Sequence, residues 1–167
     1  MLTALRSLFE YVNEFPSSIG IRESIYFYPG LLTSHVIGMC LFAGLIIMMD
    51  LRLLGVGNSR TPLSQIQKRL FPWQMTGMAI SAVTGLLLVY GQPMRFYPNI
   101  FFWIKTVMMA LAGVNALAFH LSTYRSIALW DTGARIPFAA KLSGGLGLLL
   151  WSLVIISGRL IAYNWFQ

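Results

Sequence analysis

The sequence predicts an all-α integral membrane protein, a four-helix bundle with amphipathic interfacial helices at its amino terminus. Of the 167 residues, 57% are hydrophobic and only 10% are charged, whereas soluble domains carry about 25% charged residues. Four apolar stretches are each close to the roughly 20 residues that a helix needs to cross the hydrocarbon core. Transmembrane strands are shorter and alternate in polarity. We therefore expect one membrane domain that covers residues 1–167.

Residues 1–28 are expected to form short helices on the membrane surface. In "MLTALRSLFEYVNEF" the apolar residues recur at helical spacing, and Arg6, Glu10 and Glu14 lie on the other side. This pattern is typical of a helix that lies in the interface. A second short helix is expected to begin at Ser17 or Ser18, either of which can act as its N-cap.

The four spans are expected at about residues 30–49, 71–91, 100–122 and 143–163. Small residues let membrane helices approach closely, and the last three spans contain several of them: Gly77, Ser81 and Gly85, then Ala112 and Ala116, then Gly145 and Gly147.

The net charge is +7, but the basic residues flank apolar segments and form no continuous run. Their distribution therefore indicates the orientation in the membrane, and we expect no nucleic-acid partner. The connection between the first and second spans and the connection between the third and fourth hold seven of the basic residues: Arg52, Arg60, Lys68, Arg69, Arg125, Arg135 and Lys141. On the opposite side, three arginines are balanced by three acids: Arg6, Arg22 and Arg95, with Glu10, Glu14 and Glu23. The positive-inside rule then places both termini on the outer, periplasmic side of a bacterial inner membrane.

Ionisable residues within a span are costly and are candidates for function. His35 and Lys105 each lie about five residues into a span that starts outside, roughly 8 Å below the outer surface. We expect them to meet in the bundle interior. His120 follows Lys105 by fifteen residues, or about 22 Å along the helix. A haem that bridges His35 and His120 within one subunit is therefore excluded.

Other residues add to the candidate site around His35. Arg95 and Arg159, with Lys105 and Arg22, can surround it with positive charge, which suits an anion such as a haem propionate, a lipid headgroup or a partner carboxylate. Alternatively, Arg159 extends to the interface. Met39, one turn from His35, is a candidate ligand for copper or for a haem iron.

His35 itself has three interpretations from the residues alone. It can form a structural hydrogen bond to a neighbouring helix, ligate a haem or metal, or relay protons. Asp50 and Arg52 are interpreted as marking the cytoplasmic end of the first span. Cys40 is the single cysteine, so no intramolecular disulfide is possible.

Three segments carry a resemblance: "YPGLLTSHVIG", "FAGLIIMMDLRLLG" and "FFWIKTVMMALAGVNALAFH". Together they resemble a family of small, uncharacterised bacterial four-helix membrane proteins. More remotely, the layout is similar to the haem-binding protoporphyrinogen oxidase family and to the copper-resistance D-domain membrane proteins. The former resemblance implies roles around a haem b for His35 and, through "WIK", for Trp103 and Lys105. Gly44 and Arg52 are rough counterparts of two further family residues.

The sequence thus leads to three hypotheses about function. The first is a haem b-binding electron-transfer or accessory subunit of a larger membrane redox complex, with no activity as an enzyme on its own. The second is a structural membrane subunit that binds no cofactor and docks a partner or lipids. The third is a copper-handling protein that uses His35 and Met39. Redox subunits in the membrane or periplasm, and a second copy of the chain, are the expected protein partners.

Overall fold

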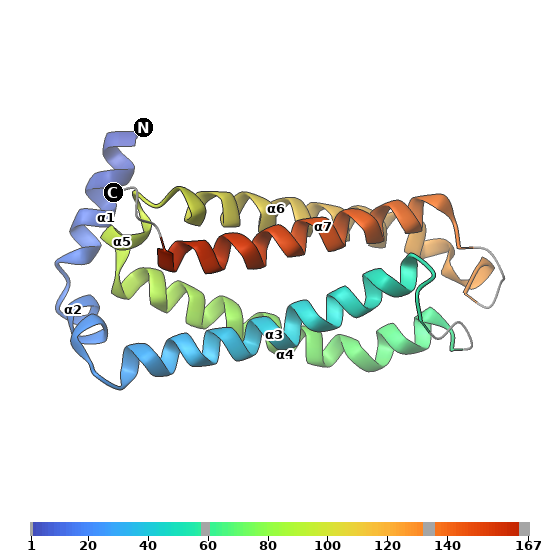
Figure 1. Ribbon diagram of the computed structural model, residues 1–167, viewed down its shortest axis with the longest axis horizontal. Coiled ribbons are helices and arrows are strands. Elements are labelled where there is room, and N and C mark those ends of the chain that lie inside the picture. Colours follow the sequence, from blue (N-terminus) through green and yellow to red (C-terminus); the bar gives the residue numbers. More distant parts are fainter. Residues whose placement is uncertain (1, 58–60, 132–135, 164–167) are drawn as a thin grey trace.

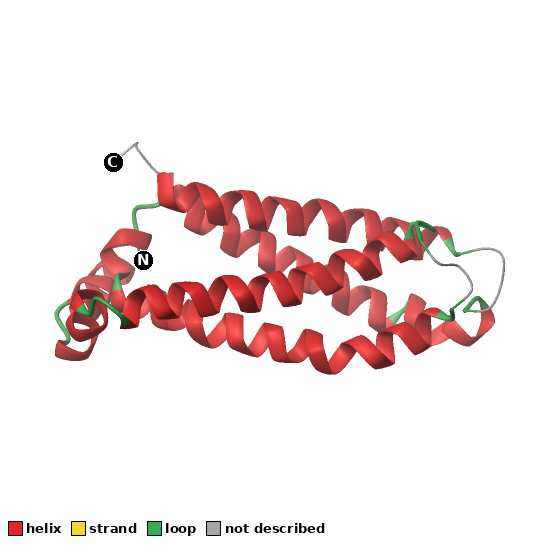
Figure 2. Cartoon of the chain, turned by 60° about the horizontal axis from the view of Figure 1, so that its bottom comes forward, coloured by secondary structure: helices red, strands yellow, loops and turns green. Residues whose placement is uncertain are grey.

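The computed structural model describes residues 2–57, 61–131 and 136–163, which contain helices and no strand (Figure 2). Four of the helices are long and apolar enough to cross a membrane: α3 (Phe27–Leu53), α4 (Leu63–Gly91), α6 (Ile100–Leu121) and α7 (Phe138–Leu160). The prediction of an all-α membrane bundle is confirmed. Arg60 and Arg135 lie outside the described residues.

Three of the four helices extend beyond the apolar spans expected from the sequence. α3 ends at Leu53 instead of near residue 49, α7 begins at Phe138, and α4 begins at Leu63, eight residues before the expected span. Hydropathy marks only the hydrocarbon layer, whereas helical hydrogen bonds continue through polar segments such as "LSQIQKRL". α6 agrees with the expectation because the Asn99 side chain caps it, accepting a hydrogen bond from the Phe101 N–H at 3.0 Å.

The bundle consists of two helix pairs. α3 packs along α4 and α6 along α7, and the pairs are joined mainly by α3 against α7 (Figure 1). α3 and α7 come together where α3 ends and α7 begins, and they diverge toward the opposite end (Figure 1, Figure 2). The first end, with the α3–α4 connection and the short helix η1 (Thr123–Leu129), is called the loop end. The opposite end is called the terminal end.

Glycines set the close contact between α3 and α4. A Cβ added to Gly38 would lie 3.0 Å from the Ser81 backbone nitrogen, and one added to Gly77 would lie 2.8 Å from that of Phe42. The predicted packing role of the small residues in α4 is therefore confirmed. Helices whose backbones approach this closely need glycine at the crossing point.

Glycines also bring α7 against α3, but not all of the glycines that we expected. A Cβ on Gly144 would lie 2.8 Å from the Asp50 carbonyl oxygen, and one on Gly147 would collide with the Asp50 carboxylate. Gly145 has only Leu54 nearby, at 3.9 Å. The expectation for Gly145 is thus wrong, because helical rotation points the Gly144 and Gly147 positions toward α3 instead.

The terminal end is covered by α1 (Leu2–Asn13), α2 (Pro16–Glu23) and α5 (Pro93–Phe96). α2 begins at Pro16 and has no side-chain cap, so the expectation that Ser17 or Ser18 caps it is wrong. Ser18 is fully buried and donates a hydrogen bond to the Tyr90 carbonyl oxygen at 2.8 Å. Its hydroxyl fixes α2 to the end of α4.

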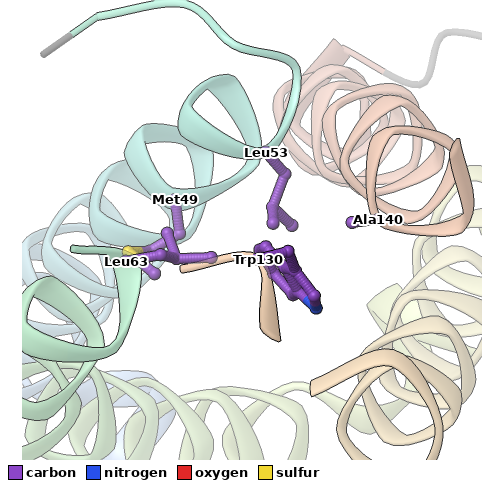
Figure 3. Packing of buried hydrophobic residues seen from close by; sticks show 5 residues of the cluster. All are labelled: Met49, Leu53, Leu63, Trp130 and Ala140. Atoms are coloured by element: carbon purple, nitrogen blue, oxygen red, sulfur yellow. The ribbon is translucent and has the colours of Figure 1, made fainter. Parts of the chain in front are cut away.

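At the loop end, the segment after η1 folds back between the helices. Trp130, only 8% exposed, packs against Met49, Leu53, Leu63 and Ala140 (Figure 3). These residues come from α3, α4 and α7. The indole therefore joins the ends of three helices.

Asp131, the next residue, joins the same segment to α4. Its Oδ1 accepts a hydrogen bond from the Ser64 backbone N–H at 3.1 Å, and its Oδ2 accepts one from the Ser64 hydroxyl. The acid thereby satisfies a backbone donor in the first turn of α4, where Pro62 cannot act as a side-chain cap. Burial raises the pKa of the nearby Tyr124 phenol, and the Asp131 charge adds to this rise.

Candidate functional site

His35 lies on α3 and turns its ring toward α4. Its Nδ1 lies 2.9 Å from the Ser81 carbonyl oxygen and 3.2 Å from the Thr84 hydroxyl. A carbonyl oxygen can only accept, so Nδ1 carries the hydrogen and donates a hydrogen bond to the Ser81 carbonyl oxygen. In the neutral imidazole the other nitrogen, Nε2, then keeps its lone pair.

Gly85 makes room for this ring. A Cβ added to Gly85 would lie 2.9 Å from His35 Cε1 and 3.3 Å from Nδ1. The edge of the imidazole therefore lies directly against the α4 backbone. Together, the Ser81 carbonyl and the Gly85 surface fix the orientation of the ring.

Lys105 reaches toward His35 from the other helix pair. It lies on α6, and its side chain crosses α7 at Gly158, where an added Cβ would be 3.3 Å from Nζ. Its charge acts on the His35 imidazole. The ammonium has no hydrogen-bond or ion-pair partner within the described part of the chain. The structure thus brings these two residues into one region at the terminal end, with His35 about 12 Å from the start of α3 and Lys105 about 8 Å from the start of α6.

Trp103 and Met39 have well-defined packing partners. The Trp103 indole N–H donates a hydrogen bond to the Tyr97 carbonyl oxygen at 2.9 Å, which orients the ring at the start of α6. Met39 is partly buried and packs against the cluster of Ala43, Ala112, Trp151 and Val154. These contacts give both side chains a structural role within the bundle.

The three arginines expected around His35 bond to other residues at the terminal end. Arg159 is exposed, donates to the Tyr163 hydroxyl at 2.7 Å and lies over its ring, with 4.8 Å from Cζ to the centroid. Arg95 donates to Gln92 at 3.0 Å, and Arg22 donates to Asn13 at 2.7 Å. These hydrogen bonds of all three guanidinium groups thus go to residues other than His35.

His120 is remote from this region, at the loop end of α6. It is exposed, its Nδ1 donates to the Ala116 carbonyl oxygen at 2.9 Å, and its ring stacks on Tyr124 with 5.0 Å between centroids. The separation along α6 that excluded a shared site with His35 thus agrees with the fold.

Sequence reasoning missed the burial of Asp50. We interpreted this acid as a boundary marker, but its side chain is only 9% exposed and lies on Gly147 of α7. Two sequence features indicate this burial: the glycine spacing in "SGGLG" and the single acid in an apolar helix. They can be connected only when α3 and α7 are known to pack together. No group of three or more His, Cys, Asp or Glu residues suited to a metal ion occurs in the described segments.

Comparison with known proteins gives one match. No curated protein and no solved structure matches the chain. A model of a family of unknown function, DUF6644, matches residues 10–164, nearly the whole chain. This agrees with the resemblance to an uncharacterised family, and it brings no activity with it. The chain therefore belongs to the DUF6644 family.

Proposed function

We propose that this chain binds haem b in the membrane through His35 and serves as an electron-transfer or accessory subunit of a larger redox complex. The observation that supports this is the hydrogen bond from His35 Nδ1 to the Ser81 carbonyl oxygen, at 2.9 Å. Histidines that ligate metals usually donate their other ring N–H to such an acceptor, which fixes the tautomer and aims the free nitrogen. Here that nitrogen is Nε2.

The surroundings of His35 fit a haem in one further respect. The Lys105 ammonium, which has no partner among the described residues, is suited to pair with a propionate. When bound, the haem iron would supply one-electron chemistry. The residues of the chain would orient the ligand nitrogen and balance charge.

The proposed orientation follows from the basic residues. Those near the loop end, such as Lys68, Arg125 and Lys141, outnumber the nearby acids, so this end would face the cytoplasm. The terminal end would then face outward and dock redox partners beside the lipid. Arg95 and Arg159, both exposed there, are candidates for contacts with a partner carboxylate or a lipid headgroup, and a second copy of the chain is another possible partner.

The hydrogen bond at His35 also favours a second candidate, a structural subunit that binds no cofactor. The hydrogen bond to the Ser81 carbonyl oxygen already gives one ring nitrogen of His35 a partner, and it holds α3 against α4. A copper site receives less support, because Met39 packs within an apolar cluster. The haem and structural candidates differ in one measurable property.

That property is the visible spectrum of the purified chain, produced with an adequate haem supply and recorded before and after dithionite. We expect a Soret band, and an α-band on reduction. His35→Ala should remove or shift both bands, while His120→Ala, the matched control on α6, should leave them unchanged. Folded wild-type chain without these bands would support the structural candidate and reject haem binding.

A second pair of variants tests the geometry while keeping the imidazole. Gly85→Ala places a methyl group where the His35 ring now lies, so it should alter the spectrum through ring displacement. Gly44→Ala, whose added Cβ has no neighbour within 4 Å, should not. Equal spectra for both variants would contradict His35 as the ligand. Copper analysis of the same samples tests the third hypothesis.

A further inference from the structure

A second buried ionisable group lies at the other end of α3, about 22 Å from His35 along the helix. The Asp50 carboxylate faces α7 at Gly147, where an added Cβ would collide with it. One turn before, Gly144 brings the α7 backbone against the Asp50 carbonyl oxygen and the Leu53 Cβ, at 2.8 and 2.9 Å from an added Cβ. The acid is thus enclosed between two closely packed helices.

The carboxylate has no counter-charge within the described residues. Asp50 Oδ2 is buried and lacks a hydrogen-bond partner there. Arg52, on the same helix, donates to the Thr61 carbonyl oxygen instead. The other charged groups of the adjoining elements are turned elsewhere: Lys68 and Arg69 on α4, Arg125 in η1 and Lys141 on α7 are exposed, and Asp131 bonds to Ser64.

Two further buried polar atoms at the loop end lack partners in the described segments. They are Arg52 Nε and Trp130 Nε1, both donors, whereas Asp50 Oδ2 is an acceptor. Trp130 packs against Leu53, one turn after Asp50. Buried polar atoms without protein partners commonly bond to enclosed water. One acceptor and two donors of this kind are suited to enclosed water.

The donor set suits a proton better than a metal ion. Hard cations take about six or more oxygen ligands, whereas the described residues here supply one carboxylate, and the α7 carbonyls are used within their own helix. A carboxylate anion enclosed without counter-charge is strongly unfavourable. A carboxylic acid removes that charge with a single proton.

We propose that Asp50 is an intramembrane proton-binding site near the loop end, occupied at neutral pH, with the glycine face of α7 as its wall. Loss of the proton places a negative charge between α3 and α7, so proton release and separation of the two helices are coupled. This site does not depend on haem binding at His35. Its chemistry requires only the proton and the enclosed water.

Infrared spectroscopy of the full chain in lipid nanodiscs tests this directly. A protonated carboxylic acid has a carbonyl stretching band that an ionised one lacks. The chain contains two aspartates, Asp50 and Asp131, so labelling with carbon-13 carboxyl aspartate should shift this band in the wild-type protein at neutral pH. The band should weaken as the pH rises, because the acid then ionises.

Two variants assign the band. Asp50→Asn should abolish it, and Asp131→Asn, the matched control, should leave it intact. Because the labelled wild-type chain gives the primary result, a failure of Asp50→Asn to fold does not remove the test. Absence of a label-sensitive acid band at neutral pH would overturn the proposal, as would a band that disappears in Asp131→Asn.

Discussion

Glycine on the facing helix accommodates each of three ionisable side chains within the bundle. These pairs are His35 on Gly85, Asp50 on Gly147 and Lys105 on Gly158. A helix without a Cβ at such a position lets a polar head lie against the backbone instead of extending into lipid. The ionisable residues can be picked out from a sequence, but their glycine partners cannot, because each pair joins helices far apart in the chain.

Gly77 and Gly44 provide a matched comparison for glycine at the residue scale. In Gly77→Ala the new methyl group would lie 2.8 Å from the Phe42 nitrogen and 3.0 Å from the Gly38 oxygen. Both are backbone atoms, so the helices must move apart, at a cost of about 1–3 kcal/mol. We expect a lower thermal unfolding temperature in detergent, followed by circular dichroism.

Gly44→Ala should behave differently, because an added Cβ there has no neighbour within 4 Å. Alanine is favoured over glycine within a helix by about 1 kcal/mol, so the unfolding temperature should stay the same or rise. If the two variants unfold at the same temperature, close contact at Gly77 is not what fixes α3 against α4.

At the scale of elements, composition and hydropathy were sufficient for the four long helices. α6 agreed to within one residue because its capping residue, Asn99, coincides with the start of the apolar stretch. α4 did not, because its first two turns are polar and are helical through backbone bonds and the Asp131 cap. Hydropathy contains no information about such a cap, which comes from a segment 67 residues away.

The Asp131 cap can be tested by its effect on the start of α4. Asp131→Ala removes the acceptor for the Ser64 N–H and should destabilise the protein by about 0.5–2 kcal/mol, the usual range for a lost cap. Amide hydrogen exchange should accelerate most in the first turn of α4. Asp131→Asn keeps a hydrogen-bond acceptor and should lose less stability than Asp131→Ala. If amide exchange in Asp131→Ala were uniform along α4, the hydrogen bonds between Ser64 and Asp131 would not stabilise this helix end.

On the scale of the whole molecule, the depth of each candidate residue in the bundle could be predicted from the sequence, but the direction of its side chain could not. Depth along the helices predicted that His35 and Lys105 share one end while His120 lies at the other, because helical rise is a fixed quantity. Depth does not give rotation about the helix axis. The rotation of each helix about its axis places Arg159 on the outside of the bundle beside Tyr163, and it directs Asp50 into the contact between α3 and α7.

The orientation of the molecule in the membrane can be tested with single cysteines. Cys40 is the one cysteine of the chain and is exposed on α3, so Cys40→Ala gives a background without thiols. Glu23→Cys then marks the terminal end and Ser126→Cys the loop end, both at exposed positions. If basic residues hold the loop end in the cytoplasm, a membrane-impermeant maleimide should label only the Glu23→Cys variant in intact spheroplasts.

Permeabilised membranes supply the control for this experiment, since both cysteines should then react. Labelling of Ser126→Cys alone in intact spheroplasts would invert the orientation. It would place the His35 region on the cytoplasmic side and make Asp50 exchange protons with the outside. Because His35 and Asp50 lie near opposite ends of one helix, this single result decides which aqueous phase each of them faces.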